Sequence, residues 1–250
     1  EIMPSLVGSE MCIRDRVMVK GLYTAYSGLT VQQKRLDVVS NNLANATTTG
    51  YKKEGLTTQS FKDVYGIKVK DETVGYINQN IGTLNLGAKV GESFRSWDQG
   101  SFQNTGNTFD FALSGSGLFS ISFTNKAGET STLYTRDGSF QMNREGYLVT
   151  KDGDFVLGEN GPIQLPTDFE KLTVEESGEI YADGQYVDRF ALVDFENYDY
   201  VEAYGENLYR AVDGATQTDA AATVNQGYLE ASNINVVTAV SYTHLTLPTT

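Results

Sequence analysis

Four leucines recur every seven residues near the start of the chain, in the stretch GLYTAYSGLTVQQKRLDVVSNNLANATTTGYKKEG (residues 21–55). A second line of residues follows three positions after each leucine. The leucines are Leu22, Leu29, Leu36 and Leu43, and the second line holds Ala25, Gln32, Val39 and Ala46. This spacing predicts an amphipathic helix over residues 18–50 whose seam makes a coiled-coil-like contact with another helix.

The predicted helix needs a partner, because packing supplies most of the stability of a helix in water. The threonines and Gly50 that follow Ala46 are poor helix formers and predict its end. A second helix is predicted to start in residues 228–240, capped by Ser232 or Asn233. We expect that this C-terminal helix is truncated after Val240 and that the missing part is the partner of the first.

Both ends of the sequence look foreign to the rest of the chain. Residues 1–17 and 241–250 resemble translated adapter sequence, and they hold the single cysteine, Cys12, and the single histidine, His244. We therefore expect two non-native flanks, with a natural start at Met18. The first sixteen residues lack a basic start followed by a sustained apolar core, so we expect no signal peptide.

The middle of the chain is predicted to be β structure. Residues 51–96 are punctuated by glycine and predict an extended connector, while residues 97–227 alternate apolar and polar positions and predict a β-rich body. Turn pairs recur every seven to eight residues over part of this body. They are Asp137–Gly138, Glu145–Gly146, Asp152–Gly153 and Asn160–Gly161, with Asp183–Gly184 further on. The predicted fold is mainly β, a hairpin-rich antiparallel sandwich or barrel-like body with a long N-terminal helix.

Charge and composition exclude several classes of protein. The net charge of −13 argues against nonspecific binding to nucleic acid, which depends on cations that neutralise phosphates. No apolar run approaches the roughly 18 residues of a spanning helix, so no membrane insertion is expected. Residues 168–213 are strongly acidic and residues 34–70 are basic, which indicates either a solvated acidic face or charge complementarity between neighbouring copies.

No motif predicts catalysis or a cofactor. A single Cys and a single His exclude a Cys/His metal site, and no histidine outside the flanks is present to activate a serine. The Gly-rich segment GSGLFS (residues 115–120) predicts a hairpin turn rather than a phosphate-binding loop. Pairs of carboxylates among 32 acidic residues are expected by chance. We therefore predict no enzyme, no metal and no cofactor.

Two surface features leave alternatives open. The aromatic residues Phe195, Tyr198, Tyr200 and Tyr204 would either stack sugars or pack strand faces and subunit contacts. The asparagines Asn41, Asn42 and Asn45 are costly inside a helix, and they would either end it or bond to backbone groups and neighbouring chains.

The motif SGLTVQQKRLDVVSNNLANATTTGYKK resembles the N-terminal signature of bacterial flagellar axial proteins. Further matches, such as YTRDGSFQMNREGYLVT and QGYLEASNINVV, extend the resemblance over residues 18–240 and favour the basal-body rod proteins. The resemblance implies a structural subunit whose N- and C-terminal helices form the inner wall of a tube. It also implies export by the flagellum-specific apparatus without a cleaved signal peptide, and a place in the basal body, assembled with copies of itself and other rod and hook proteins.

The helix opening and the compact length favour the proximal over the distal rod. The alternatives are a glycan-binding or surface module of adhesin or phage-tail type, and a carboxylate-dependent hydrolase. Neither alternative gives the leucine seam or the asparagines a role. The predicted subunit interface comprises Leu22, Ala25, Leu29, Gln32, Leu36, Val39, Asn41, Asn42, Leu43 and Asn45.

Overall fold

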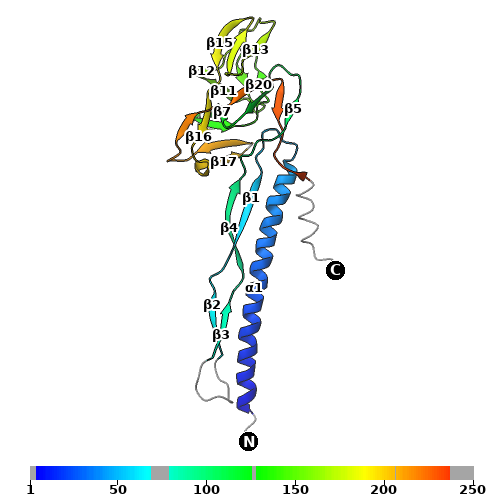
Figure 1. Cartoon of the computed structure of the whole chain (residues 1–250), viewed down its shortest axis with the longest axis vertical. Helices are drawn as coiled ribbons and strands as arrows, with labels where there is room; N and C mark the ends of the chain where they lie inside the picture. Colours follow the sequence, from blue (N-terminus) through cyan, green and yellow to red (C-terminus); the bar gives the residue numbers. More distant parts are fainter. Residues whose placement is uncertain (1–3, 69–78, 126–127, 206, 237–250) are drawn as a thin grey trace. The chain divides into compact units, whose positions relative to one another are not determined.

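The computed structural model describes residues 4–68, 79–125, 128–205 and 207–236 (Figure 1). The chain divides into two compact units. In the described part, the first unit comprises residues 4–41 and 54–95, and the second comprises residues 42–53 and 96–236. In the predicted C-terminal helical segment, residues 228–230 form a strand and residues 231–235 have no regular structure. Val236 is helical, and residues 237–240 lie outside the described residues.

The first unit is the predicted helix together with a β ribbon. Helix α1 (Pro4–Ala44) is continuous through Met18, where the sequence predicts the native start. The predicted connector forms two antiparallel pairs, and α1 runs beside them (Figure 1). The strands are β1 (Glu54–Ser60), β2 (Val64–Lys68), β3 (Gln79–Leu84) and β4 (Ala88–Arg95), paired as β1 with β4 and β2 with β3.

The second unit contains short antiparallel strands, as the alternating pattern predicts. Its largest sheet follows the order β17-β18-β8-β7-β11-β10-β9, with β12 paired to β11, and with β16 paired to β7 and β19. Among the described strands this sheet stays open and does not close into a barrel. Its members are β7 (Leu118–Thr124), β8 (Thr130–Thr135), β9 (Gln141–Met142), β10 (Leu148–Val149), β11 (Phe155–Gly158), β12 (Gly161–Pro162), β16 (Leu192–Phe195), β17 (Val201–Gly205), β18 (Leu208–Ala211) and β19 (Gln217–Asp219).

Smaller sheets complete this unit. One has the order β13-β14-β15, and two pairs join late strands to early ones, β20 with β6 and β21 with β5. A short 3₁₀ helix, η1 (Tyr198–Tyr200), precedes β17. The strands are β5 (Phe102–Asn104), β6 (Phe111–Ser114), β13 (Leu172–Val174), β14 (Glu179–Ala182), β15 (Gln185–Arg189), β20 (Thr223–Gln226) and β21 (Tyr228–Glu230).

The hydrophobic core belongs to the second unit. Its main cluster gathers aromatic and aliphatic side chains from many of the short strands, with Phe111, Phe119, Phe140 and Phe190 in mutual ring contact. In the first unit, Val31 is the one buried hydrophobic side chain among those the structure describes. The helix and ribbon therefore hold together with little apolar burial of their own.

Most predicted turns are confirmed, and two are wrong. Asp183 and Gly184 both have positive φ and join β14 to β15 as a tight hairpin. Asp137–Gly138 is not a hairpin turn, because β8 pairs with β7 and β18 and not with the following strand. The segment at residues 115–117 is not a hairpin turn either, because β6 pairs with β20 and so lies outside the sheet of β7.

Candidate assembly surface

The predicted leucine seam is an exposed ridge on α1. Leu22 and Leu29 are the most exposed of the four leucines, at 70% and 67%, and Leu36 and Leu43 are 38% and 42% exposed. Ala25 and Gln32 on the second line are also exposed, and Val39 is half-buried. We call Leu22, Leu29, Leu36 and Leu43 the leucine ridge. Leucines at such exposure on one helix form an apolar surface that is typical of a contact site.

The helix packs on its own ribbon through another face. Val31 is buried, and Gly87 of the ribbon approaches Ser27 so closely that a side chain on Gly87 would collide with it. Because an α-helix turns about 100° per residue, Val31 lies roughly 160° around the axis from Leu29. The contact within this unit therefore uses the side of α1 that faces away from the leucine ridge.

The three asparagines of the predicted interface have different surroundings. Asn41 is exposed, whereas Asn42 is 4% exposed and its Oδ1 accepts a hydrogen bond from the Tyr51 hydroxyl (3.4 Å). Asn45 Oδ1 accepts one from the Thr48 hydroxyl (3.2 Å). In this structure, Asn42 and Asn45 therefore make contacts inside the second unit, at the turn that follows α1.

That turn leads to a buried cluster of three charges. Lys52 Nζ lies 2.8 Å from Glu230 Oε1, and Arg136 Nε lies 2.6 Å from Glu230 Oε2. All three side chains are at most 4% exposed. We call Lys52, Arg136 and Glu230 the charge junction. It joins the segment after α1 to β21, the last strand described, across 178 positions of sequence.

The junction groups also bond to backbone around them. Arg136 donates to the carbonyls of Leu113, Gly115 and Gly117, which fixes the Gly-rich segment that the sequence predicts as a hairpin turn. Lys52 Nζ donates to the carbonyl of Asp98 (2.9 Å). Burying ions costs several kcal/mol each, and this cost is offset only where every charge is paired and hydrogen-bonded, as it is here.

The two chain segments at the junction are also joined directly. The backbone NH of Gly50 donates to the carbonyl of Glu230 (2.7 Å), and the Asn207 side chain donates to the carbonyl of Thr49 (2.8 Å). Asn233 donates to the carbonyl of Ser96 (2.9 Å) and accepts from the backbone NH of Lys53 (2.7 Å). These bonds hold the segment after α1 against the end of β21, the last strand described, and against the residues that follow it.

The surroundings of the junction shift the pKa values of Glu230 and Lys52. Burial alone would raise the pKa of Glu230, but Arg136 and Lys52 outweigh it and hold that pKa below its ordinary value. Burial lowers the pKa of Lys52, and hydrogen bonding to Glu230 opposes this shift only in part. The depressed pKa keeps Glu230 ionised near neutral pH.

We expect the charge junction to make the free energy of unfolding depend on pH in the acidic range. Because the folded pKa of Glu230 is depressed, its stabilising contribution is present above the ordinary carboxyl pKa and is lost as pH falls through the folded value. Unfolding by urea, measured from pH 7 down to pH 3, is expected to show a decline in stability that is shallower in Glu230→Gln. Parallel curves for the two proteins would contradict the assignment.

The backbone near the charge junction leaves no room for a side chain at Gly50, so substitution there is expected to lower stability. This residue has φ +66°, and a Cβ there would lie 2.6 Å from the backbone of Arg136. Gly50→Ala is expected to lower the free energy of unfolding by about 1–3 kcal/mol through backbone strain, with the collision adding to it. Gly184→Ala is the matched control, since Gly184 has φ +81° and open space around it. Equal losses in urea titrations of the two variants would show that the close approach at Gly50 is unimportant.

The sequence did not predict the junction. Lys52 is one of two adjacent lysines after the turn that follows α1, Glu230 is the one charge at the end of β21, and nothing in their spacing links them. The one available signal was Glu230 in the segment YLEAS, where a strand that precedes a helix cap carries a lone acid among small and apolar residues.

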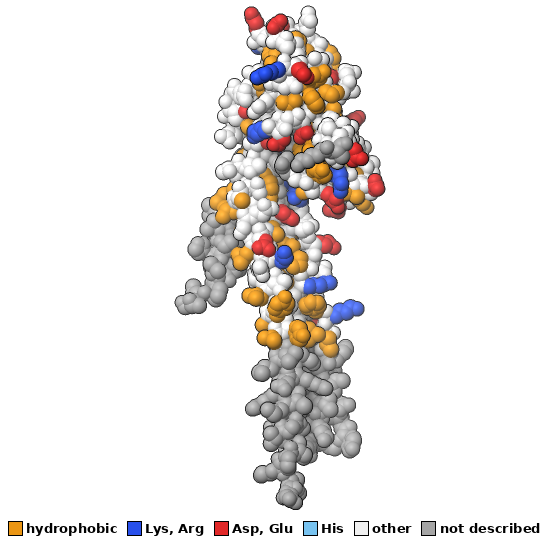
Figure 2. All heavy atoms as spheres, turned by 180° about the vertical axis from the view of Figure 1, so that it is seen from behind, with side chains coloured by type: hydrophobic (Ala, Val, Ile, Leu, Met, Phe, Trp, Pro, Cys, Tyr) orange, Lys and Arg blue, Asp and Glu red, His pale blue; other side chains and the backbone are white. Residues whose placement is uncertain are grey.

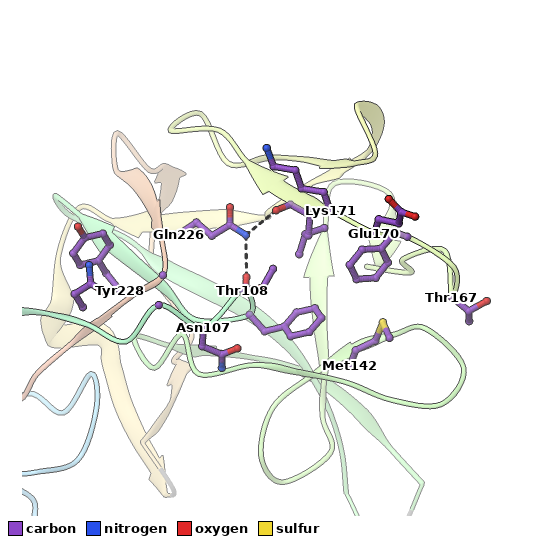
Figure 3. Close-up of a pocket in the computed structure, with 14 residues that line it drawn as sticks. Asn107, Thr108, Met142, Thr167, Glu170, Lys171, Gln226 and Tyr228 are labelled. Atoms are coloured by element: carbon purple, nitrogen blue, oxygen red, sulfur yellow. Dashed lines mark hydrogen bonds between the residues drawn. The ribbon is translucent and has the colours of Figure 1, made fainter.

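A concave site on the body tests the alternative of glycan binding. It has a volume of about 660 Å³ and is lined by Phe109, Phe169, Gln226 and other residues. Figure 3 shows Gln226 at the site, where its amide donates to the carbonyls of Thr108 and Leu172. This bonding leaves Gln226 little capacity for a ligand. The predicted sugar-stacking aromatics do not line the site.

Those aromatics pack instead into the body. Phe195 is 3% exposed, and Tyr198 stacks on Trp97 with ring centroids 4.5 Å apart. Tyr204 contacts Phe123 edge to face, with ring centroids 5.3 Å apart. Of the two interpretations of this run, the structure favours the packing of strands, with Tyr200 and Tyr204 still partly exposed.

Two known families match segments of the chain. The family described as flagella basal body rod protein matches residues 22–52, and the one described as flagellar hook protein FlgE/F/G D1 domain matches residues 112–182. Flagellar basal-body rod protein FlgG of Bacillus subtilis (strain 168) is 34% identical to the chain over 238 positions, covering 88% of this chain and 86% of the relative. The chain belongs to the flagellar basal-body rod protein family.

Other basal-body rod proteins are similar over comparable lengths. FlgG of Agrobacterium fabrum (strain C58 / ATCC 33970) is 31% identical over 241 positions, with 89% of this chain and 88% of the relative covered. FlgF of Caulobacter vibrioides (strain ATCC 19089 / CIP 103742 / CB 15) is 32% identical over 228 positions, with 90% of this chain and 86% of the relative covered.

Membership in the rod protein family confirms the main functional prediction. The chain is a structural subunit of the flagellar rod and not an enzyme, it belongs to the flagellar basal body, and it assembles with other axial proteins of the flagellum. The rod-protein match includes the leucine ridge and Lys52. Over the described residues, no helix combines the length and the apolar character that crossing a membrane requires.

Proposed function

We propose that this rod subunit assembles with copies of itself through the leucine ridge of α1. The observation that carries the proposal is the pair of opposed faces on one helix. One face is packed on the ribbon of the same chain, and the other exposes leucines at up to 70%. A helix seam of this kind gains its stability when a partner covers it. We propose a neighbouring molecule as that partner, in place of the C-terminal helix of the same chain that the sequence leads one to expect.

The gain from covering the ridge is large enough to drive assembly. Complete burial of an exposed leucine is worth about 1.5–3 kcal/mol, so the four leucines together would contribute several kcal/mol per contact. Leu22, Leu29 and Leu36 of the predicted interface would lie at its centre, with Ala25 and Gln32 beside them. Asn42 would act indirectly, by holding the end of α1 in place.

We propose the distal rod as the position of the subunit. The helix opening and the chain length favour the proximal rod, but the similarity to FlgG proteins over nearly their whole length favours the distal rod. The relative named FlgF is similar to nearly the same degree, so the position needs an experiment. Delivery by the flagellar export apparatus, which the motif resemblance implies, is part of the same proposal.

Immunogold labelling of purified hook–basal bodies tests this function. An epitope inserted at Asp152–Gly153 would be placed in an exposed turn, where Gly153 has open space around it. Gold particles are expected on the distal part of the rod in the bacterium that encodes the chain. Label on the proximal part would contradict the proposed position, and unlabelled particles from swimming cells that produce the tagged chain would contradict the function.

A further inference from the structure

A groove in the first unit lies between α1 and the β ribbon. It has a volume of about 490 Å³, and most of its lining is apolar. Figure 2 shows hydrophobic side chains gathered on this unit. The lining includes Tyr26, Thr30 and Val31 from the helix, and Phe61, Leu86 and Val90 from the ribbon.

The groove and the leucine ridge are both apolar surfaces. Residues 21–33, which contribute to both, carry no charged side chain. Among the described residues of the lining, Lys89 is the one that is charged, and its long aliphatic stem can lie along an apolar surface while its ammonium group stays in water. A contact between these two surfaces would therefore bury apolar groups without removing a charge from water.

The ridge also matches the groove in length. The helical side of the groove extends from Tyr23 to Val31, which is about 12 Å along the axis at 1.5 Å per residue. Leu22 and Leu29, the two most exposed leucines, are about 10 Å apart on the same scale. Both leucines of one molecule would thus fit within the groove of another.

We propose that the ridge leucines Leu22 and Leu29 of one copy occupy the groove between α1 and the ribbon of the next copy. This inference rests on the proposed function and names the acceptor surface for the ridge. Ridge and groove lie on different sides of α1, so a molecule that fills its neighbour's groove still offers its own groove to a third. Such a head-to-tail contact does not close on a pair and extends into an open helical assembly.

Two variants separate the surfaces. Leu29→Glu places a carboxylate on the ridge and leaves the groove lining intact. Thr30→Glu places one in the groove and leaves the ridge leucines intact, and Thr30 is an exposed helix position. Thr130→Glu, on an exposed position of β8, is the control with the same change of side chain and charge. The full chain is studied in each case by sedimentation velocity over a range of concentrations.

The proposal predicts a specific result on mixing. Leu29→Glu and Thr30→Glu should each remain monomeric, with association weakened roughly tenfold or more, while Thr130→Glu assembles as the unaltered chain does. An equimolar mixture of the first two should form dimers and nothing larger, because one intact ridge meets one intact groove.

The failures are distinguishable. If Thr30→Glu assembles normally while Leu29→Glu does not, the groove is not the acceptor, and the proposed function through the ridge stands. If both variants assemble normally, the ridge proposal falls as well. An unaltered chain that stays monomeric at every concentration overturns the contact between copies, and so does a mixture that gives no dimers.

Discussion

Replacing Glu230 by alanine is expected to lower the free energy of unfolding of the second unit by about 3–5 kcal/mol. The loss arises because the variant leaves Lys52 and Arg136 buried, close together and without their shared carboxylate. It also removes the acceptor of the Gly100 backbone NH (2.8 Å). Urea denaturation followed by near-ultraviolet circular dichroism measures the change, since Trp97 and many tyrosines belong to this unit.

The matched control is Glu202→Ala. Glu202 lies 3.2 Å from Arg210, but both side chains are more than half exposed. An exposed ion pair of this kind is worth at most about 1 kcal/mol, because water and salt screen it. A similar, small loss in both variants would show that the junction does not hold the unit together.

A second large effect is expected at the ridge. The double substitution Leu29→Glu, Leu36→Glu is expected to abolish swimming in cells that depend on the chain. Neither leucine is buried in the monomer, so the free energy of unfolding is expected to change by less than about 0.5 kcal/mol. Motility in soft agar and the yield of basal bodies measure the effect on assembly.

A control with equal charge makes this test specific. Thr130→Glu, Thr132→Glu adds two carboxylates to exposed positions of β8. These cells are expected to swim if the defect of the ridge variant comes from its position and not from two added charges. Normal swimming of the ridge variant itself would contradict the assembly surface.

The ridge was predictable because helix periodicity is a local property. A spacing of seven residues places Leu22, Leu29, Leu36 and Leu43 on one face whatever the rest of the chain does. The type I′ hairpin at Asp183–Gly184 was predictable for the same reason, since its two residues determine the turn. The mainly β character of the body was predictable from the alternation of apolar and polar residues along single strands.

The junction and the groove were not predictable from local pattern. Glu230 meets Lys52 and Arg136 only because strand pairing brings segments 178 and 94 positions apart together. Asp137–Gly138 has the composition of a hairpin turn, yet the partners of β8 are distant strands and the loop instead packs near Thr49, whose hydroxyl donates to Asp137. The groove forms only where α1 and the ribbon meet. The hydrophobic periodicity of a sequence describes a helix or a strand singly and does not show which elements pack together.

The reactivity of a thiol placed on the leucine ridge tests most directly whether neighbouring molecules cover the ridge. Leu29→Cys is introduced together with Cys12→Ser, so that the only thiol of the chain lies on the ridge. Its rate of reaction with a maleimide is measured in the free monomer and in purified basal bodies. The thiol is expected to react fast in the monomer and at a rate lower by about tenfold or more in the assembly, where a neighbouring molecule covers it. Equal rates in the two states, or a thiol already protected in the monomer, would contradict this expectation.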